Sequence, residues 1–385
     1  GIIPSFTRPR TGEVIPGDPS VFEWNKFSPR FGFAYNAGES RKTVVRGSAG
    51  IYYDGNVGGG WNAPPPQPPE LQAYASLSGP DGPFDIFWWN WTPGDATNVD
   101  PNLEPPKTVQ YSLGFEHEIK GIYSVGLMGV YKDTSDMIGW EFLNDAVYDT
   151  IPFTDPVNGQ EYTLWEISQF PTTRKGNGPG YTADGFKPDY WQEYYALIAT
   201  FNRRFTNRWD MFASYTYSKS EGLNPRALSQ TQNNPLYGSK EGSHPNQWFN
   251  VDGALQVGDR PHMFRVQSNF EMGWGLRASA SINLQSGQPY YRLVEAPYST
   301  IAGRQNYFVA EKFRHSTWNM VDFALGKDFE FGNDMRFKID LQFLNLLNSD
   351  ATNRMDFRTL APGESFRPSS WVKPRRLQIR LGIDF

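Results

Sequence analysis

Hydrophobic and polar residues alternate along most of this chain, in short segments separated by turns. The last segment shows the pattern most clearly, because Leu377, Ile379, Leu381, Ile383 and Phe385 alternate with polar residues and glycine. Successive side chains of a β-strand point to opposite faces, so this segment predicts a strand with one apolar and one polar face. On its own it also fits an edge strand of a soluble sheet.

The same alternation recurs upstream and predicts eleven strands in all. On each of them the apolar face carries almost no charge, whereas the opposite face carries residues such as Arg46, Glu116, Arg277, Asp340 and Arg380. The predicted strands span residues 26–36, 42–54, 108–119, 123–131, 195–201, 211–217, 264–270, 276–284, 321–329, 335–343 and 376–385.

The connections fall into two classes, short and long. Lys120-Gly121 is a connection with the glycine signal of a tight hairpin, and short polar turns are also predicted at 37–41, 206–207, 273–275 and 332–333. Long segments without periodicity are rare in compact domains. We expect them to be irregular loops, spanning residues 1–25, 55–106, 133–189, 220–260, 286–316 and 345–374.

This combination favours an all-β, transmembrane, antiparallel up-and-down β-barrel with short periplasmic turns and long extracellular loops. A soluble sandwich seldom joins its strands with connections of such unequal length. A β-propeller would need four strands in each repeat, and here each repeat holds two. Aromatic residues near the predicted strand ends, among them Tyr123, Tyr131, Tyr215, Tyr217 and Phe329, are typical of the interfacial girdles of a membrane barrel.

Composition narrows the class further. The mean hydropathy of -0.58 and the lack of a long apolar run argue against a helical membrane protein. The chain has no cysteine, which excludes disulfides and thiolate metal sites. Its net charge of -5 argues against nucleic acid as a partner.

Placing every short turn in the periplasm puts Gly1 outside the cell and Phe385 in the periplasm. Single-chain bacterial barrels have an even number of strands and both termini in the periplasm. Eleven strands therefore predict a partial barrel that needs further strands from a partner or an upstream segment. The chain begins without a methionine or a signal peptide, which also suggests a processed or partial chain.

Several motifs resemble the late barrel of the large TonB-dependent receptors of the Oar-like type. The resemblance covers nearly the whole chain in order. It is carried by residues 27–35 (FSPRFGFAY), 42–47 (KTVVRG), 50–54 (GIYYD), 202–205 (NRRF), 213–220 (ASYTYSKS), 259–262 (DRPH), 286–290 (SGQPY) and 345–348 (NLLN).

The resemblance implies an outer-membrane barrel of about twenty-two strands, of which this chain would be the C-terminal half. It also implies an N-terminal plug and a TonB-contacting segment, neither of which has a counterpart in these 385 residues. The expected partners are the lipid bilayer and lipopolysaccharide, the other barrel half and its plug, the TonB complex through that plug, and the barrel-assembly machinery. Phe385 is similar to the C-terminal aromatic signal that this machinery reads.

Ligand capture is expected at the extracellular loops, which are rich in aromatic residues. Tryptophan rings stack on sugars and peptide side chains, so we predict binding of a bulky solute such as a glycan or a peptide. These tryptophans could equally pack the loops into a rigid cap, and the barrel could instead anchor surface loops for adhesion. The candidate ligand-binding residues are Trp61, Trp88, Trp89, Trp91, Trp140 and Trp165.

Catalysis is not expected. The four histidines, His117, His244, His262 and His315, are scattered, and no metalloprotease, nucleophile-elbow or phosphate-loop motif is present, so no cofactor is predicted. His117 and His262 fit structural or interfacial roles. A calcium site is a weak alternative in the first long loop, whose spacing matches no EF-hand. It would use Asp81, Asp85, Asp95 and Asp100.

Overall fold

The computed structural model of the chain is built from β-strands. The structure describes residues 6–7, 14–15, 24–54, 71–79, 82–91, 96–99, 104–136, 140–142, 147–169, 173–176, 191–223, 246, 258–296, 306–331, 335–356 and 367–385. Within these ranges, no helix has the length and apolar character needed to cross a bilayer.

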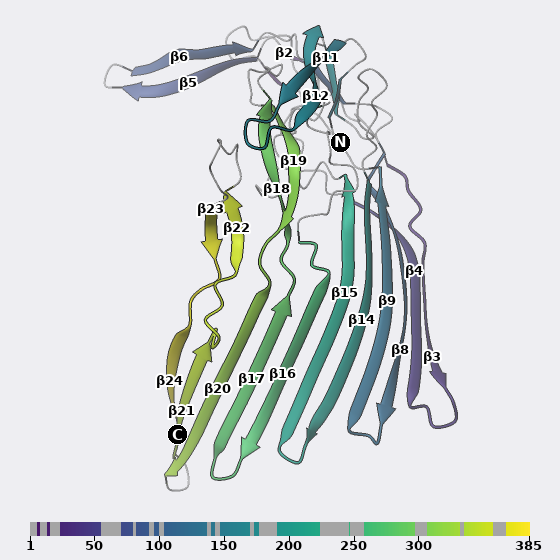
Figure 1. Cartoon of the computed structure of the whole chain (residues 1–385), viewed down its shortest axis with the longest axis vertical. Helices are drawn as coiled ribbons and strands as arrows, with labels where there is room; N and C mark the ends of the chain where they lie inside the picture. The colour runs from purple at the N-terminus through teal and green to yellow at the C-terminus, as the bar shows by residue number, and fades with distance from the viewer. Residues whose placement is uncertain are drawn as a thin grey trace.

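Eleven strands form one antiparallel sheet, in the order β24-β21-β20-β17-β16-β15-β14-β9-β8-β4-β3 (Figure 1). Each strand pairs with the next one of this set along the chain, so the predicted up-and-down order and the strand number are confirmed. The strands are β3 (Arg30–Ala37), β4 (Thr43–Tyr53), β8 (Lys107–Ile119), β9 (Tyr123–Ser135), β14 (Trp191–Thr206), β15 (Trp209–Leu223), β16 (His262–Met272), β17 (Leu276–Gln285), β20 (Trp318–Phe331), β21 (Met335–Leu344) and β24 (Arg376–Asp384).

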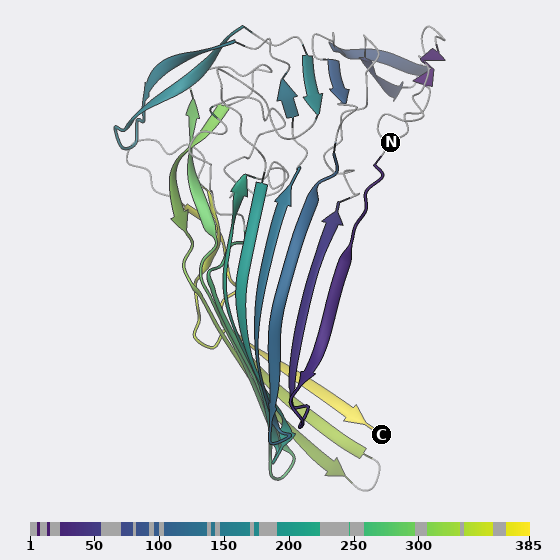
Figure 2. The ribbon, with the colours of Figure 1, turned by 90° about the vertical axis from the view of Figure 1, so that its right-hand side faces the viewer.

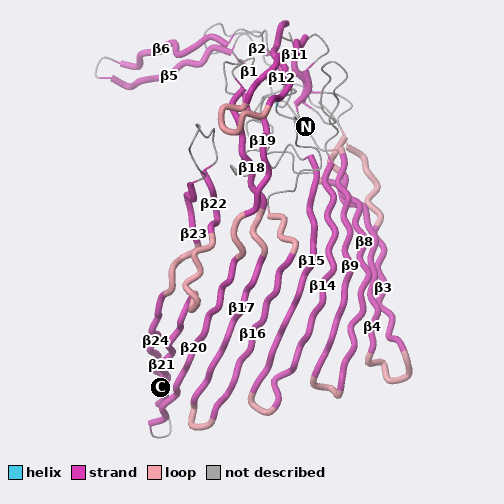
Figure 3. Tube along the Cα trace, in the orientation of Figure 1, coloured by secondary structure: helices cyan, strands magenta, loops and turns pink. Residues whose placement is uncertain are grey.

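The sheet curves into an open wall with β3 and β24 at its two edges (Figure 2). The short connections lie at one end of this wall, which we call the turn end, and the long connections lie at the other, the loop end (Figure 3). Tight reversal at the turn end uses the left-handed backbone conformation: Lys120 and Gly121 have φ of 53° and 69°, and Asn207 and Arg208 have φ of 51° and 67°.

The strand register confirms one continuous apolar face. Phe115 lies opposite Val45 on one side and Leu127 on the other, and the same face continues to the far edge, where Leu341 lies opposite Ile379. Many of these large side chains are exposed in the isolated chain, including Leu113 at 61% and Leu381 at 63%. An apolar face of this size requires an apolar environment such as a bilayer.

The opposite face is polar and carries ion pairs between different strands of the sheet. Arg46 lies 3.1 Å from Glu116 on the next strand, and Arg204 lies 2.8 Å from Glu118. Further along the sheet, Lys338 on β21 forms an ion pair with the carboxylate of β24 residue Asp384. Both signs of charge are therefore present on the face that would line a lumen.

The expectation that the long connections are irregular is wrong, because the described parts of these connections contain short strands of their own. The exception is the connection 220–260, of which the structure describes few residues. The alternation of the short strands is interrupted by bulges and flanked by Pro and Gly, which hides the strand signal in the sequence. The pairs are β1 (Phe6–Thr7) with β2 (Val14–Ile15), β5 (Leu71–Gly79) with β6 (Gly82–Trp91), β11 (Val147–Thr154) with β12 (Glu161–Gln169), β18 (Pro289–Ala296) with β19 (Asn306–Arg314), and β22 (Thr352–Asp356) with β23 (Arg367–Trp371), while β13 (Thr173–Gly176) lies between β10 (Trp140–Phe142) and β7 (Ala96–Val99).

The hydrophobic core that the structure describes lies beyond the loop end of the wall. Leu164 is fully buried there, together with Tyr162, Val294 and Ala310, and Phe153 packs against this cluster. These residues come from β11, β12, β18 and β19, so the two hairpins form one packed unit above the wall (Figure 1). The wall itself has no core of this kind because its apolar side chains point outward.

Candidate functional site

An ion pair between Asp259 and Arg314 fastens the loop-end rim. Arg314 Nη2 lies 2.5 Å from Asp259 Oδ2, and the Asp259 side chain is 1% exposed. Asp259 Oδ1 accepts a hydrogen bond from the backbone amide of Ser220 at 2.7 Å, while Arg314 Nη1 donates to the Gly287 carbonyl at 3.1 Å. The pair therefore holds the start of β16, the end of β15 and the base of the β18–β19 hairpin together.

Arg260, the next residue of the same motif, extends this junction toward β20. Its Nη1 donates to the Ser286 carbonyl at 2.8 Å, and its guanidinium lies 4.5 Å from the centroid of the Trp318 ring. Burial lowers the pKa of the Arg260 guanidinium. Two motifs that suggested a family resemblance, 259–262 and 286–290, thus meet in space and build the rim.

His315 closes the same junction from the other side. The residue is 5% exposed, its ring lies 4.7 Å from the ring of Tyr290, and its Nδ1 lies 3.0 Å from Thr352 Oγ1. Burial lowers the pKa of His315 to about 4, and the positive charge of Arg260 adds to this shift. The imidazole is therefore neutral at neutral pH, and it packs as part of the rim.

A third motif, residues 345–348, fixes the last long connection. Asn345 is buried, and its Nδ2 donates to the carbonyls of Ser349 and Lys373, both at 2.9 Å. Its backbone amide donates to Asp322 Oδ1 at 2.7 Å, and Asn348 Oδ1 accepts from the Arg375 amide at 3.0 Å. Asn345 and Asn348 adopt positive φ, which asparagine tolerates better than most residues. These contacts fix the position of the segment that leads into β24.

A buried charge cluster joins the two hairpins above the rim. Arg292 on β18 is 1% exposed, and its Nη2 lies 2.5 Å from Asp155 Oδ2, whose side chain is fully buried. Arg292 Nε also forms an ion pair with Glu311 on β19. Burial alone would raise the pKa of Asp155, but hydrogen bonds from Arg292 and from the Val157 amide lower it below its ordinary value. No motif in the sequence pointed to Asp155 or Arg292.

Five of the six predicted tryptophans lie where the structure describes no side chain, so it does not test whether they form one site. Trp61 lies outside the described residues, and Trp140 begins β10. The residues Trp88, Trp89 and Trp91 belong to β6 of a hairpin that projects away from β11 and β12 (Figures 1 and 2), and the side chains of this hairpin are not described.

Trp165 is the one candidate whose surroundings are described. It is half-buried on β12, and the buried side chain of Asn246 holds its backbone. Asn246 Oδ1 accepts from the Trp165 amide at 2.8 Å, and Asn246 Nδ2 donates to the Trp165 carbonyl at 2.8 Å. The ligand-binding role of the six tryptophans remains a prediction.

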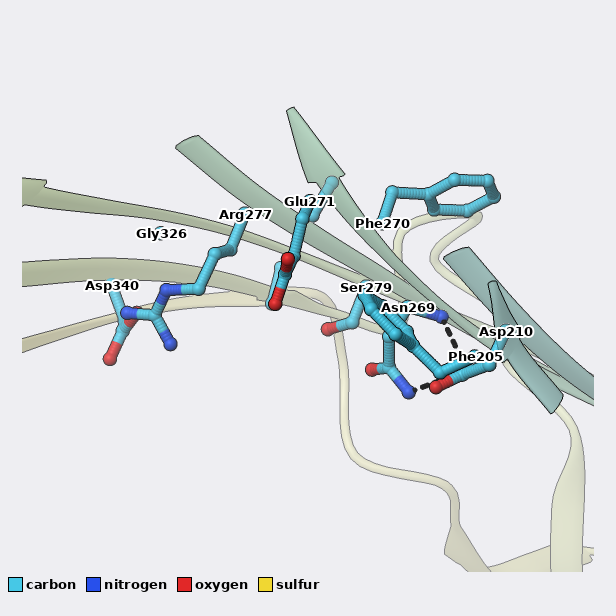
Figure 4. Close-up of a pocket in the computed structure, with 11 residues that line it drawn as sticks. Phe205, Asp210, Asn269, Phe270, Glu271, Arg277, Ser279, Gly326 and Asp340 are labelled. Atoms are coloured by element: carbon cyan, nitrogen blue, oxygen red, sulfur yellow. Dashed lines mark hydrogen bonds and ion pairs between the residues drawn. The ribbon is translucent and has the colours of Figure 1, made fainter. Parts of the chain in front are cut away.

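The polar face is hollowed near the turn end by a pocket of about 320 Å³. Arg277 lies within it, near Asp340 (Figure 4). Its Nη2 is 3.3 Å from Asp340 Oδ1 and 2.7 Å from Asp328 Oδ1. Gly326 leaves the space for this contact, since a Cβ there would lie 2.5 Å from Asp340 Oδ1. Asp210 accepts from the Asn269 side chain at 2.9 Å. Of the charged residues that line the pocket, Asp210, Glu271 and Asp340 are acidic and Arg277 is basic.

The described histidines occupy structural positions. His117 lies on the apolar face, where its Nδ1 is 2.7 Å from Thr43 Oγ1, and His262 lies between Tyr215 and Tyr217, with ring centroids 6.2 and 5.5 Å away. Within the described ranges, no group of three or more His, Asp or Glu residues is arranged to hold a metal ion. His244 lies outside those ranges, and the calcium alternative is untested: Asp81, Asp95 and Asp100 lie outside them as well, and the side chain of Asp85 is not described.

Comparisons with known proteins agree with this geometry. The family description "Outer membrane beta barrel domain" matches residues 16–290. No curated protein matches the chain. Among solved structures, the outer membrane transporter YddB from Escherichia coli is similar, with 14% identity, a TM-score of 0.52, and 93% of this chain and 40% of that chain covered.

Two further solved structures are similar at lower TM-scores. The siderophore receptor PirA from Acinetobacter baumannii has 10% identity and a TM-score of 0.47, with 93% of this chain and 41% of that chain covered. The copper transporter OprC has 11% identity and a TM-score of 0.45, with 99% and 43% covered. The chain thus spans less than half the length of these structures.

Proposed function

This chain belongs to the outer membrane beta barrel domain family, and from that premise we propose that it is one half of the barrel of a TonB-dependent receptor that imports or exports a bulky solute. The observation that carries the proposal is the open eleven-stranded sheet with one apolar and one polar face. About twenty-two strands would close such a wall into a barrel wide enough to hold a plug.

The contrast between short and long connections supports a proposed orientation in the membrane. Outer-membrane barrels place short turns in the periplasm and long loops outside the cell. We therefore assign the turn end, with Phe385, to the periplasm and the hairpins at the loop end to the cell surface. A membrane-impermeant maleimide should label Asn158→Cys in intact cells and Asn333→Cys only after the outer membrane is opened. The reverse labelling would contradict the assignment.

Solute passage would follow the polar face. The ion pairs and the acidic pocket around Arg277 keep this face hydrated, so a plug or a polar solute can contact it without burying unpaired charge. Energy would reach the site through the plug from the TonB complex, as in other receptors of the proposed class. The protein itself would perform no covalent chemistry.

Solute capture would take place on the loop-end hairpins. The β11–β12 and β18–β19 unit supplies a rigid base through its core and its buried charge cluster. The aromatic hairpin β5–β6 supplies Trp88, Trp89 and Trp91. A glycan or a peptide fits flat aromatic faces of this kind.

The test uses the full-length protein that contains this chain. Its purified form should bind a purified periplasmic domain of TonB, and its tryptophan fluorescence should change with maltoheptaose or with a casein peptide digest. Changing Trp88, Trp89 and Trp91 together to alanine should lower the affinity measured in that titration about tenfold. Trp318→Phe at the rim should leave the affinity unchanged.

The competing function is an outer-membrane anchor for surface loops that mediate adhesion, which the projecting β5–β6 hairpin favours (Figure 1). An anchor would bind cells or matrix through its loops and would need no TonB. If a strain that lacks TonB adheres fully and the purified protein does not bind the TonB domain, the anchor function is favoured over the receptor function.

A further inference from the structure

The turn between β16 and β17 carries a tryptophan that is not packed in the chain. Trp274 is 90% exposed, and it lies between two glycines in a turn that the Leu276 amide closes on the Gly273 carbonyl at 3.4 Å. The backbone of Trp274 has φ of 63°, a conformation that a bulky residue seldom adopts. A tight turn would form more readily with asparagine or glycine, so folding does not explain a tryptophan here.

Two cations flank this turn. A Cβ built on Gly273 would lie 3.8 Å from Arg208 Nη1, and one built on Gly275 would lie 3.5 Å from Lys327 Nζ. Lys327 Nζ donates to the Trp274 carbonyl, which uses one of its three donors. The guanidinium of Arg208 makes no hydrogen bond or ion pair with the residues that the structure describes. Donors of both side chains therefore remain available.

Lys327 belongs to the apolar face of the wall. It lies opposite Leu276 and Ile339 in the register, and its Nζ lies 5.3 Å from the centroid of the Phe329 ring, which is on the same face. The neighbouring Asp328 points to the other face, where its carboxylate binds Arg277 at 2.7 Å. The positive charge of Lys327 is thus not neutralised by the acid beside it in the sequence.

The loop end of the same apolar face has a different charge pattern. There the cations have acidic partners: Lys219 lies 2.7 Å from Glu221, and Lys107 lies 3.6 Å from Asp136. At the turn end, by contrast, the described strand positions of the apolar face carry the cations Arg203 and Lys327 and no acidic residue. An uncompensated positive charge next to lipid attracts anions.

We propose that Arg208, Lys327 and Trp274 form a binding site for the phosphodiester headgroup of an anionic phospholipid at the turn-end surface of the membrane. The two cations bind the phosphate oxygens, and the indole occupies the interfacial region, where its ring contacts acyl chains and its N–H contacts polar groups. The site rests on the chain being part of an outer-membrane barrel. The proposed orientation decides only which leaflet supplies the lipid, and neither TonB nor the solute enters the argument.

Native mass spectrometry of the full-length protein, released from detergent with defined lipids, tests the site. We expect phosphatidylglycerol to be retained in preference to phosphatidylcholine with the same acyl chains. The double variant Arg208→Gln/Lys327→Gln should lower that preference about thirtyfold, since each of the two cations near a membrane surface contributes on the order of 1 kcal/mol and about 1.4 kcal/mol corresponds to tenfold. Arg208→Lys/Lys327→Arg keeps both charges and should retain it.

Lys338→Gln is the matched control. Lys338 lies on the adjacent strand, one register position from Lys327, but on the polar face, so its loss should leave the lipid preference intact. Equal retention of both lipids by the unaltered protein would overturn the proposal, as would an equal loss in Lys338→Gln. Displacement of the lipid by inorganic phosphate alone would also overturn it, because the site would then bind a free anion. Slower migration after heating in gel electrophoresis shows that each variant is folded.

Discussion

Arg292 and Asp155 lie 137 positions apart in the sequence, yet Arg292 Nη2 lies 2.5 Å from Asp155 Oδ2, and both side chains are buried. This contact, with the cluster around Leu164, joins β11–β12 to β18–β19 above the wall. Breaking one partner of a buried pair leaves the other charge without compensation. The two hairpins therefore act as one unit on which the loop end is built.

Asp155→Ala should separate the two hairpins without unfolding the wall. Among the described residues, the change leaves Arg292 with Glu311 as its acidic partner, and loss of a buried ion pair costs about 3 kcal/mol. Hydrogen exchange of residues 147–169 and 289–296 should increase, while that of β8 and β9 stays unchanged. Glu161→Gln, an exposed change on β12, is the control. If the hairpins of Asp155→Ala were as well protected from hydrogen exchange as those of the unaltered protein, the apolar cluster alone would join them.

The rim around His315 should loosen in mild acid. The folded pKa of about 4 lies below the ordinary value of 6.5, so between these values the unfolded rim binds a proton that the folded rim does not. Stability is therefore complete above pH 6.5 and falls by up to about 3 kcal/mol as the pH drops to 4. Hydrogen exchange of residues 286–288 and 315–317, corrected for intrinsic rates, should show the change, and His315→Asn should remove it.

Asp155 should respond to acid in a lower window. Its folded pKa is lowered from 3.8, so its contribution is complete above the ordinary pKa and is lost as the pH falls through the folded value. The two hairpins should thus stay joined at pH 5, where the His315 rim has already weakened. Loss of both at the same pH would contradict the separate assignment of the two groups.

Gly287→Ala should disturb the rim by overpacking. A Cβ at this position would lie 1.7 Å from the His315 carbonyl oxygen, and backbone must move to make room, which costs about 1–3 kcal/mol. The yield of folded, heat-modifiable protein in the outer membrane should fall. Gly32→Ala, whose Cβ would lie 3.7 Å from the nearest atom outside its neighbours, should be tolerated. A normal yield of Gly287→Ala would show that the backbone adapts.

Arg203→Met should weaken the turn between β14 and β15. The guanidinium is almost fully buried, donates to the carbonyls of Thr206 and Trp209, and lies 3.6 Å from the centroid of the Trp209 ring. Losing these contacts should cost about 2–3 kcal/mol. Urea-driven unfolding in detergent measures the change. Arg208→Met, in the same turn but exposed, should leave the midpoint unaltered.

Deleting Phe385 should impair assembly into the membrane more than solute binding. The residue follows β24 and is 98% exposed, so it adds little to the packing of the chain and is available to an assembly factor. Phe385→Tyr keeps an aromatic end and should assemble normally. The amount of folded protein in outer-membrane fractions measures the effect, and unimpaired insertion of the deletion would refute the role.

Alternation alone determined the eleven-stranded sheet, its up-and-down order and its two faces, because each side chain of a strand is assigned to a face by its position. The turn at Lys120 and Gly121 was equally visible, since tight reversals restrict residue types. Residues 345–348 and 259–262 stood out as motifs, but their contacts did not.

Only the tertiary structure decided how the long connections fold and what holds them. Asp155 and Arg292 pair across 137 positions, and Asn246 binds the Trp165 backbone across 81 positions. No local sequence pattern encodes a contact over such a separation. The hairpins at the loop end were missed because bulges and prolines interrupt their alternation. The strands of the wall follow from local periodicity, whereas the rim, its buried charges and the cations beside Trp274 depend on segments that meet only when the sheet has formed.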